Sequence, residues 1–140
     1  MSVSVLLAFA LAMVVLGGML FFLAVIAPTV FRTFDGENAA RFVRAMFPLY
    51  YLVLGGVSAL AALLAALGGR GTAAMLLALI AGGFAAARWG LMPRINALRD
   101  RANAGDEAAG PRFHALHRAS VGLNAAQMAG LIAVAMLLAR

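Results

Sequence analysis

The residues best suited to chemistry lie in the last apolar stretch of the sequence. Its polar members are three, four and three residues apart, so an α-helix would present them on one face: His117, Ser120, Asn124 and Gln127. Gln127 would lie about 12 Å inside such a helix, at ~1.5 Å per residue. An unpaired amide in hydrocarbon costs several kcal/mol. The stripe must therefore face protein, water or a ligand, and it predicts either interhelical hydrogen bonds or a polar cavity.

Arg88 is an ionisable residue near the end of another apolar stretch. Its long side chain either extends to the lipid headgroups, a boundary that Trp89 also suits, or turns inward to the level of His117. In the second case its guanidinium could hold a carboxylate or a phosphate. With the polar stripe, it belongs to a candidate ligand pocket of Arg32, Tyr51, Arg88, His117, Ser120, Asn124 and Gln127.

His114 and His117 are three residues apart, a spacing that allows both to bind one metal ion. No Asp or Glu lies nearby in the sequence to complete such a site, so hydrogen-bonded interfacial histidines are the simpler interpretation. Haem ligation by His117, with Arg88 on a propionate, is an alternative that would make the protein an oxidoreductase or a haem carrier. The cofactor stays open between none, haem and a metal ion.

Motifs for catalysis are missing from the sequence. It contains no P-loop, no nucleophile elbow and no HExxH motif, and the absence of cysteine excludes disulfides and thiolate metal sites. All five acidic residues lie outside the apolar stretches, which argues against a proton-coupled transporter. An enzyme is therefore the less favoured interpretation.

The elements that must position these residues are membrane spans. The 140 residues are 65% hydrophobic and 11% charged, far from the balance of a soluble domain. Four apolar stretches reach the ~20 residues that cross a bilayer. We predict an all-α membrane protein, a single integral domain over residues 1–140 that forms an antiparallel bundle of four transmembrane helices. The predicted spans are residues 3–27, 49–67, 72–92 and 119–139.

The arginines predict how the bundle is oriented. Connections on one side carry eight of them, whereas the side of both termini carries two, Arg70 and Arg140. The positive-inside rule places the eight in the cytoplasm and both termini in the periplasm. The alanine- and arginine-rich composition favours a bacterial inner membrane. The net charge of +6 is thus a topology signal and predicts no nucleic-acid partner.

The connections are not plain loops. Between residues 35 and 47, apolar residues recur at helical spacing around Arg41 and Arg44, which predicts a short amphipathic helix at the interface between spans 1 and 2. Pro48 would then restart the chain as span 2. Residues 103–107 and 110–111 read as a turn, followed by a helix that enters span 4. Pro28 and Pro93, 65 residues apart, hint at two duplicated hairpins.

Small residues four apart recur in the last three spans and favour close helix packing. The lipid bilayer is one predicted partner. The small-residue face of span 4, with Gly122, Ala126, Ala129 and Ala133, suits a homodimer and equally another helix of the same bundle.

Four short motifs resemble a known family and occur in its order. They are residues 21–32, residues 46–51, Ala87-Arg88-Trp89 with Pro93-Arg94, and residues 113–124. Together they resemble the transmembrane protein 205-like family, also termed domain of unknown function 4149. The resemblance implies a small four-span membrane protein with no established activity. That family is distantly similar to small membrane families linked to copper resistance and to haem biosynthesis, a kinship by association only.

These observations predict a multi-pass inner-membrane protein with a polar pocket near its cytoplasmic side that binds or carries a small ligand. One alternative is a haem- or metal-binding protein that uses His117. Another is a purely structural bundle whose polar residues only fix the register of the helices.

Overall fold

The computed structural model describes residues 2–140, and this part of the chain is helical almost throughout, without a strand. The elements in chain order are α1 (Val3–Phe21), η1 (Phe22–Ile26), α2 (Ala27–Thr33), α3 (Gly36–Leu67), α4 (Gly71–Ala86), η2 (Ala87–Leu91), α5 (Met92–Asn103) and α6 (Ala109–Leu138). The two η elements are π-helical segments that join their neighbours without a break. Four continuous rods result, and each is long and apolar enough to span a membrane. The predicted four-span bundle is confirmed.

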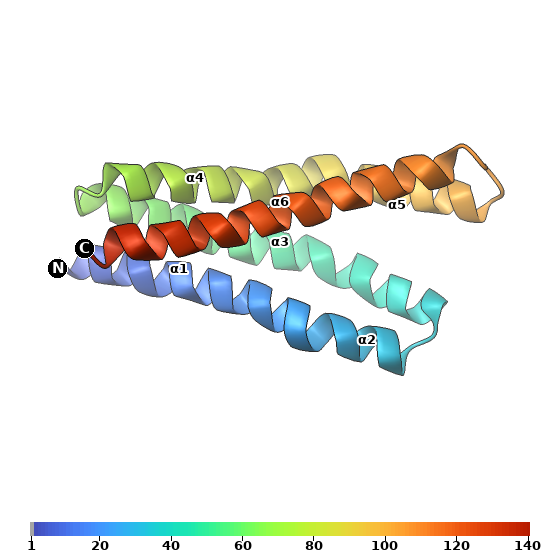
Figure 1. Cartoon of the computed structure of the whole chain (residues 1–140), viewed down its shortest axis with the longest axis horizontal. Coiled ribbons are helices and arrows are strands. Elements are labelled where there is room, and N and C mark those ends of the chain that lie inside the picture. The colour runs from blue at the N-terminus through green and yellow to red at the C-terminus, as the bar shows by residue number, and fades with distance from the viewer. Residues whose placement is uncertain (1) are drawn as a thin grey trace.

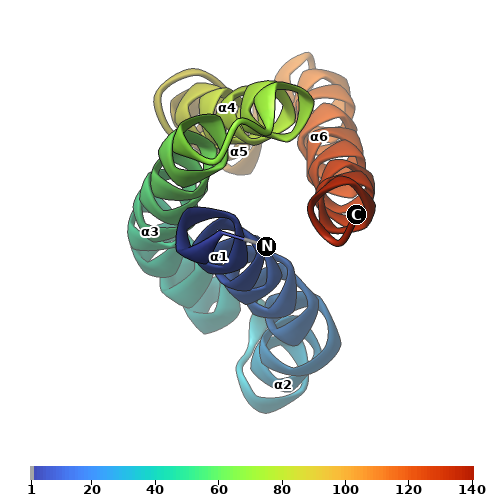
Figure 2. The same ribbon diagram turned by 90° about the vertical axis from the view of Figure 1, so that its left-hand side faces the viewer.

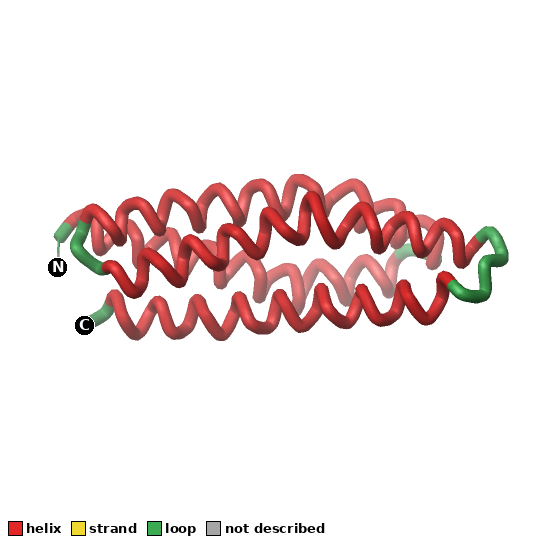
Figure 3. Tube along the Cα trace, turned by 90° about the horizontal axis from the view of Figure 1, so that it is seen from above, coloured by secondary structure: helices red, strands yellow, loops and turns green. Residues whose placement is uncertain are grey.

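The rods run antiparallel, and both termini lie at one end of the bundle (Figure 1). Short loops connect the rods only at the two ends (Figure 3). Viewed along the bundle, α1, α3, α4 and α6 follow one another around an arc (Figure 2). Each packs on its neighbours, and α6 also packs on α1, but α6 makes few contacts with η1 or α2. The bundle is therefore closed at the end of the termini and splayed between α2 and α6 at the other.

The rods are 30 to 33 residues long, and so they exceed the predicted spans. At ~1.5 Å per residue they reach about 45–50 Å, whereas the hydrocarbon layer is ~30 Å thick. Charged residues at the end of the termini are confined to the helix tips, at Arg70 and Arg140. The surplus length therefore lies at the opposite end, where most arginines are found.

Small residues bring the rods into close contact. Alanines fill much of the core, and Ala8, Ala12, Ala61 and Ala65 have no exposed surface. At Gly83 of α4, a β-carbon would lie only 2.8 Å from Nε2 of Gln127 on α6. This contact places the amide of Gln127 directly against the main chain of α4.

The two hairpins, residues 3–67 and 71–138, share one plan. The π-helical segments begin 65 residues apart, at Phe22 and Ala87, and Pro28 and Pro93 follow each of them at the same distance. The first rods also match in register at 65 residues, with the buried pairs Ala8/Ala73, Ala12/Leu77, Val15/Ile80 and Met19/Phe84. The second rods match at 73 residues, with the buried pairs Leu54/Gln127, Ser58/Leu131, Ala61/Val134 and Ala65/Leu138.

The predicted break at Pro48 is wrong. Residues 36–47 are helical as expected, but they continue into span 2 as one helix, α3, with Pro48 inside it. Proline removes only the donor that would serve the carbonyl of Arg44, four residues earlier, and a long helix tolerates this loss. The expected interfacial helix is thus the first part of α3, which Asp35 caps with a 2.8 Å hydrogen bond from the Asn38 N–H.

The predicted second turn is right in part. Residues 104–108 form the loop between α5 and α6, but Gly110 and Pro111 already belong to α6, which begins at Ala109. Pro111 is tolerated because the first N–H groups of a helix have no partner within it. The tight turn at Gly68–Gly69 is also present, with Gly69 at φ +73°, where glycine is favoured.

Candidate functional site

A cavity of about 360 Å³ lies in the half of the bundle that carries most arginines. Its size falls in the range of small-molecule sites. Its walls come from both hairpins, chiefly from η1, α3, α5 and α6. They consist of Met19, Phe22, Leu23, Ala27, Phe31, Ala40, Val43, Arg44, Phe47, Tyr50, Tyr51, Met92, Ile95, Asn96, Arg99, Phe113, His117, Ser120, Val121, Asn124, Ala125 and Met128.

An aromatic cluster forms the inner wall of the cavity. The ring of Phe22 on η1 lies 5.3 Å from that of Phe47 and 5.4 Å from that of Tyr50, both on α3. Phe47 in turn stacks on Tyr51 at 5.1 Å. Edge and offset contacts of this kind hold aromatic rings in fixed orientations. The cluster therefore gives the inner part of the cavity a rigid, apolar surface.

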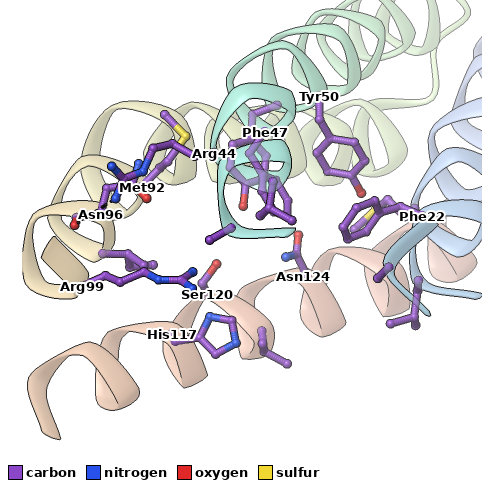
Figure 4. Close-up of a pocket in the computed structure, with 18 of the residues that line it drawn as sticks. Phe22, Arg44, Phe47, Tyr50, Met92, Asn96, Arg99, His117, Ser120 and Asn124 are labelled. Carbon is purple, nitrogen blue, oxygen red and sulfur yellow. Dashed lines mark hydrogen bonds between the residues drawn. The ribbon is translucent and has the colours of Figure 1, made fainter. Parts of the chain in front are cut away.

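The polar wall comes from α6. His117, Ser120 and Asn124 all line the cavity, as helical spacing predicts for residues on one face (Figure 4). The hydroxyl of Tyr51, on α3, lies close to the side chains of Ser120 and Asn124. His117 stacks on Phe113 one turn earlier, with ring centres 5.9 Å apart. A row of donors and acceptors thus faces the aromatic wall across the cavity.

Two arginines complete the site at its outer end. Arg44 of α3 is paired with Asp100, at 2.6 Å between Nη2 and Oδ1. Arg99 reaches from α5 toward Ser120 and His117 of α6 (Figure 4). Within residues 2–140, Arg99 takes part in none of the ion pairs, and no acidic residue lines the cavity. The outer end is therefore cationic.

Four of the seven predicted pocket residues line this cavity, namely Tyr51, His117, Ser120 and Asn124. Gln127 does not, because it is 4% exposed and donates a 3.0 Å hydrogen bond to the carbonyl of Ile80 on α4. Arg32 is exposed on α2. Arg88 turns to the neighbouring helix, where its guanidinium donates to the carbonyl of Pro48 and its carbon Cζ lies 5.4 Å from the Trp89 ring centre.

Arg44, Asn96 and Arg99 also line the cavity but were not among the predicted pocket residues. The two arginines were predicted to set the topology, and Arg44 also to belong to the amphipathic helix. Yet Met92, Asn96 and Arg99 are four and three residues apart, the same spacing that revealed the polar face of α6. This polar face could not be predicted from the sequence, because the whole segment is polar and the spacing does not distinguish one face from the others.

His117 has no ready partners for a metal ion. Among residues 2–140 there is no group of three or more His, Asp or Glu side chains placed to hold one. His114 and His117 both contact Phe113, whose ring lies 5.3 Å from the first and 5.9 Å from the second. The arrangement shows ring contacts by these imidazoles and no further metal-ligating side chains beside them in the described part of the chain.

The fold defines a class, the multi-pass helical membrane proteins with four spans. Residues 7–104 match the family model described as domain of unknown function (DUF4149), and the chain belongs to this family. The match covers three of the four rods, and α6, which supplies the polar wall, lies beyond it. No curated protein and no solved structure matches the chain.

Proposed function

We propose that the protein binds a small ligand in the cavity at the arginine-rich end of the bundle and acts as a binding protein or carrier. The observation that carries this proposal is a contrast within one helix face. Gln127 packs against α4, where its Nε2 donates to the Ile80 carbonyl while its Oε1 is buried without a partner, whereas Ser120 and Asn124 of the same stripe line an open volume. Tyr51 is one polar neighbour of both side chains, and it leaves further donors and acceptors of the Asn124 amide and the Ser120 hydroxyl facing the cavity. A ligand, with or without water, supplies their partners.

The geometry favours binding over catalysis. Ser120 and His117 both line the cavity, but no hydrogen bond joins them within the described chain, and no carboxylate is placed to orient His117. A nucleophile and its base normally lie within hydrogen-bond reach, with a third group holding the base. The cavity walls otherwise offer aromatic rings, amides and guanidinium groups, which recognise and hold molecules.

The proposal includes an orientation, with the cavity on the cytoplasmic side of a bacterial inner membrane and both termini in the periplasm. It is supported by eight arginines at one end against Arg70 and Arg140 at the other. Because the chain has no cysteine, single variants Ser2→Cys and Asn103→Cys can be labelled cleanly in spheroplasts with an impermeant maleimide. We expect labelling at position 2 and protection at position 103, and the reverse would overturn the orientation.

Kinship with the narrower transmembrane protein 205-like group is also part of the proposal. It rests on the motifs around Pro28, Pro48, Arg88 and His117, which fall at the π-helical segments and around the cavity.

The ligand can be sought by native mass spectrometry of protein extracted gently from its own membrane. Ala125→Trp places an indole in the cavity, while Ala126→Trp places one on the exposed face next to it. We expect an extra mass on the wild-type protein and on Ala126→Trp that is lost from Ala125→Trp. Absence of any adduct on the wild-type protein, or equal retention by both variants, would contradict a ligand in this cavity.

Absorption spectroscopy and elemental analysis of the same purified protein test the haem or metal alternative. It rests on His117, which lines the cavity. An absorption band that disappears in His117→Ala, or a stoichiometric metal by elemental analysis, would make it the leading function. A colourless and metal-free protein, expressed with haem available, would remove it.

A further inference from the structure

We infer, on the basis of the proposed function, that the ligand is a single-chain anionic amphiphile, an acyl chain that ends in a phosphate or carboxylate. Three observations lead to this class: the polarity gradient of the cavity, the state of its charges, and an opening toward the bilayer.

The cavity changes from polar to apolar along the bundle axis on three helices at once, and on two of them the polar residue is an arginine. On α5, Arg99 lies at the outer end and Met92 about 10 Å deeper, at ~1.5 Å per residue. On α3, Arg44 precedes Tyr51 by the same distance, and on α6, His117 precedes Met128 by about 16 Å. All six residues line the cavity. An amphiphile has this same gradient along its own length.

The charges at the outer end suit an anion. Arg44 is neutralised by Asp100 at 2.6 Å, but Arg99 has no carboxylate partner among residues 2–140. Ser120 stands beside the Arg99 guanidinium as a further donor (Figure 4), and Asn96, whose main-chain carbonyl accepts from Arg44, also lines the cavity. A guanidinium with a neighbouring hydroxyl group matches the oxygens of a phosphate or carboxylate. A cationic ligand would meet repulsion and no acidic side chain in the lining.

The apolar part opens to the side, where lipid chains would lie. Leu23 and Phe31 on one flank and Val121 on the other all line the cavity, yet they are 60%, 65% and 55% exposed. They stand where η1 and α2 diverge from α6, which they scarcely contact (Figure 2). With the surplus rod length at the arginine-rich end, this gap faces hydrocarbon at Leu23 and Val121 and the headgroup region at Phe31. An acyl chain can therefore reach the aromatic wall without crossing water.

The test uses purified full-length protein in an uncharged detergent and three probes measured by native mass spectrometry. Oleoyl lysophosphatidate carries both parts of the ligand, monooleoylglycerol carries the chain alone, and glycerol 3-phosphate carries the headgroup alone. We expect lysophosphatidate to bind at least about tenfold more tightly than either fragment. In Arg99→Gln this preference should fall by about tenfold, while Arg99→Lys keeps most of it. Arg32→Gln, which removes an exposed arginine outside the cavity, should bind like the wild type.

Each contrary outcome removes a defined part of the inference. Equal binding of monooleoylglycerol would overturn the anionic headgroup, and equal binding of glycerol 3-phosphate would overturn the chain and indicate a free anion. An unchanged preference in Arg99→Gln, with its helix content intact by circular dichroism, would overturn the assigned headgroup site. If no probe binds while wild-type protein still carries a native adduct that Ala125→Trp loses, the amphiphile class fails but the proposed function stands. If no adduct is found either, both fail.

Discussion

The two hairpins meet along two seams, and these seams differ although the hairpins share one plan. In the closed seam, between η2 and α3, Arg88 donates to the carbonyl of Pro48. The positions that correspond to these two residues, at 65 and 73 residues along the shared register, are Leu23 on η1 and Val121 on α6. Both line the cavity. The cavity is thus the open seam, the counterpart of a contact that exists on the other side of the bundle.

The difference teaches how one repeated scaffold can produce an asymmetric site. A guanidinium is long and has five donors, so it can bridge two helices through a main-chain carbonyl. A leucine in the corresponding place is shorter and has no donor, and the facing helix is left apart. The site therefore depends on the side chains at a few matched positions, while the backbone plan is common to both halves.

The largest predicted effect comes from breaking the closed seam. Arg88→Leu gives η2 the residue that η1 has at the matching position and removes the bond to Pro48. Hydrogen bonds to charged groups contribute about 1.5–3 kcal/mol, so we expect the free energy of unfolding to fall by about 2 kcal/mol. Unfolding by SDS in mixed micelles measures it. Arg94→Leu, at an exposed position on α5, is the control, and equal stability of the two variants would show that Arg88 does not hold the seam.

An intermediate effect is expected from matched glycines inside the hairpins. A β-carbon at Gly83 would lie 2.8 Å from Gln127 Nε2, whereas one at Gly18 would lie 3.3 Å from Leu54 Cδ2. Gly83→Ala therefore displaces the Gln127 amide from the Ile80 carbonyl. We expect it to cost about 1 kcal/mol and Gly18→Ala to cost less, by the same SDS titration.

The neighbouring glycines supply the controls for this pair. A β-carbon at Gly17 or Gly82 meets no atom within 4 Å. Gly17→Ala and Gly82→Ala should leave stability unchanged or raise it slightly, because alanine favours helix over glycine. A cost for Gly18→Ala equal to that of Gly83→Ala would mean that the Gln127 hydrogen bond adds nothing.

The smallest effect concerns the acidic residues of the two outer turns. The backbone N–H of Asn38 lowers the pKa of Asp35 below its ordinary value of 3.8, and the Arg101 guanidinium lowers that of Asp106. A lowered pKa stabilises the folded turn above about pH 3.8, and this contribution disappears as the pH falls through the lowered pKa. In a carboxyl ¹³C NMR titration, Arg101→Gln should raise the pKa of Asp106 and leave that of Asp35 unchanged. A shift at both would show that the turns are coupled.

The membrane-spanning helices and the polar face of α6 could be predicted from the sequence, because both depend on the local pattern of residues. Hydropathy over about 20 residues locates a span, and helical spacing alone places His117, Ser120 and Asn124 together. The same spacing put Gln127 with them. Its role in a helix contact depends on Gly83 of another rod, and no periodicity within α6 carries that information.

The contacts of the remaining residues could not be predicted from the sequence, because they depend on tertiary structure. Arg88 had two expected directions, headgroups or pocket, and it takes neither, because the Pro48 carbonyl lies within its reach. In the sequence Arg99 resembles any other arginine of the long connections, and only the packing of α5 on α6 distinguishes it. Pro48 could be taken for a helix start since a proline fits there equally well in isolation.

Each π-helical segment leaves one main-chain carbonyl without a main-chain donor, which makes that point of the helix a place for water to bind. The N–H of Ala27 bonds to the carbonyl of Phe22, and Pro28 has no N–H, so neither main-chain donor that could serve the carbonyl of Leu23 is available. In the second hairpin the N–H of Met92 bonds to the carbonyl of Ala87 and Pro93 has no N–H, so the carbonyl of Arg88 is left without a main-chain donor in the same way. Hydrocarbon supplies no donor. Each π-helical segment therefore carries one hydrophilic point in its main chain, and it persists whichever side chain occupies position 23 or 88.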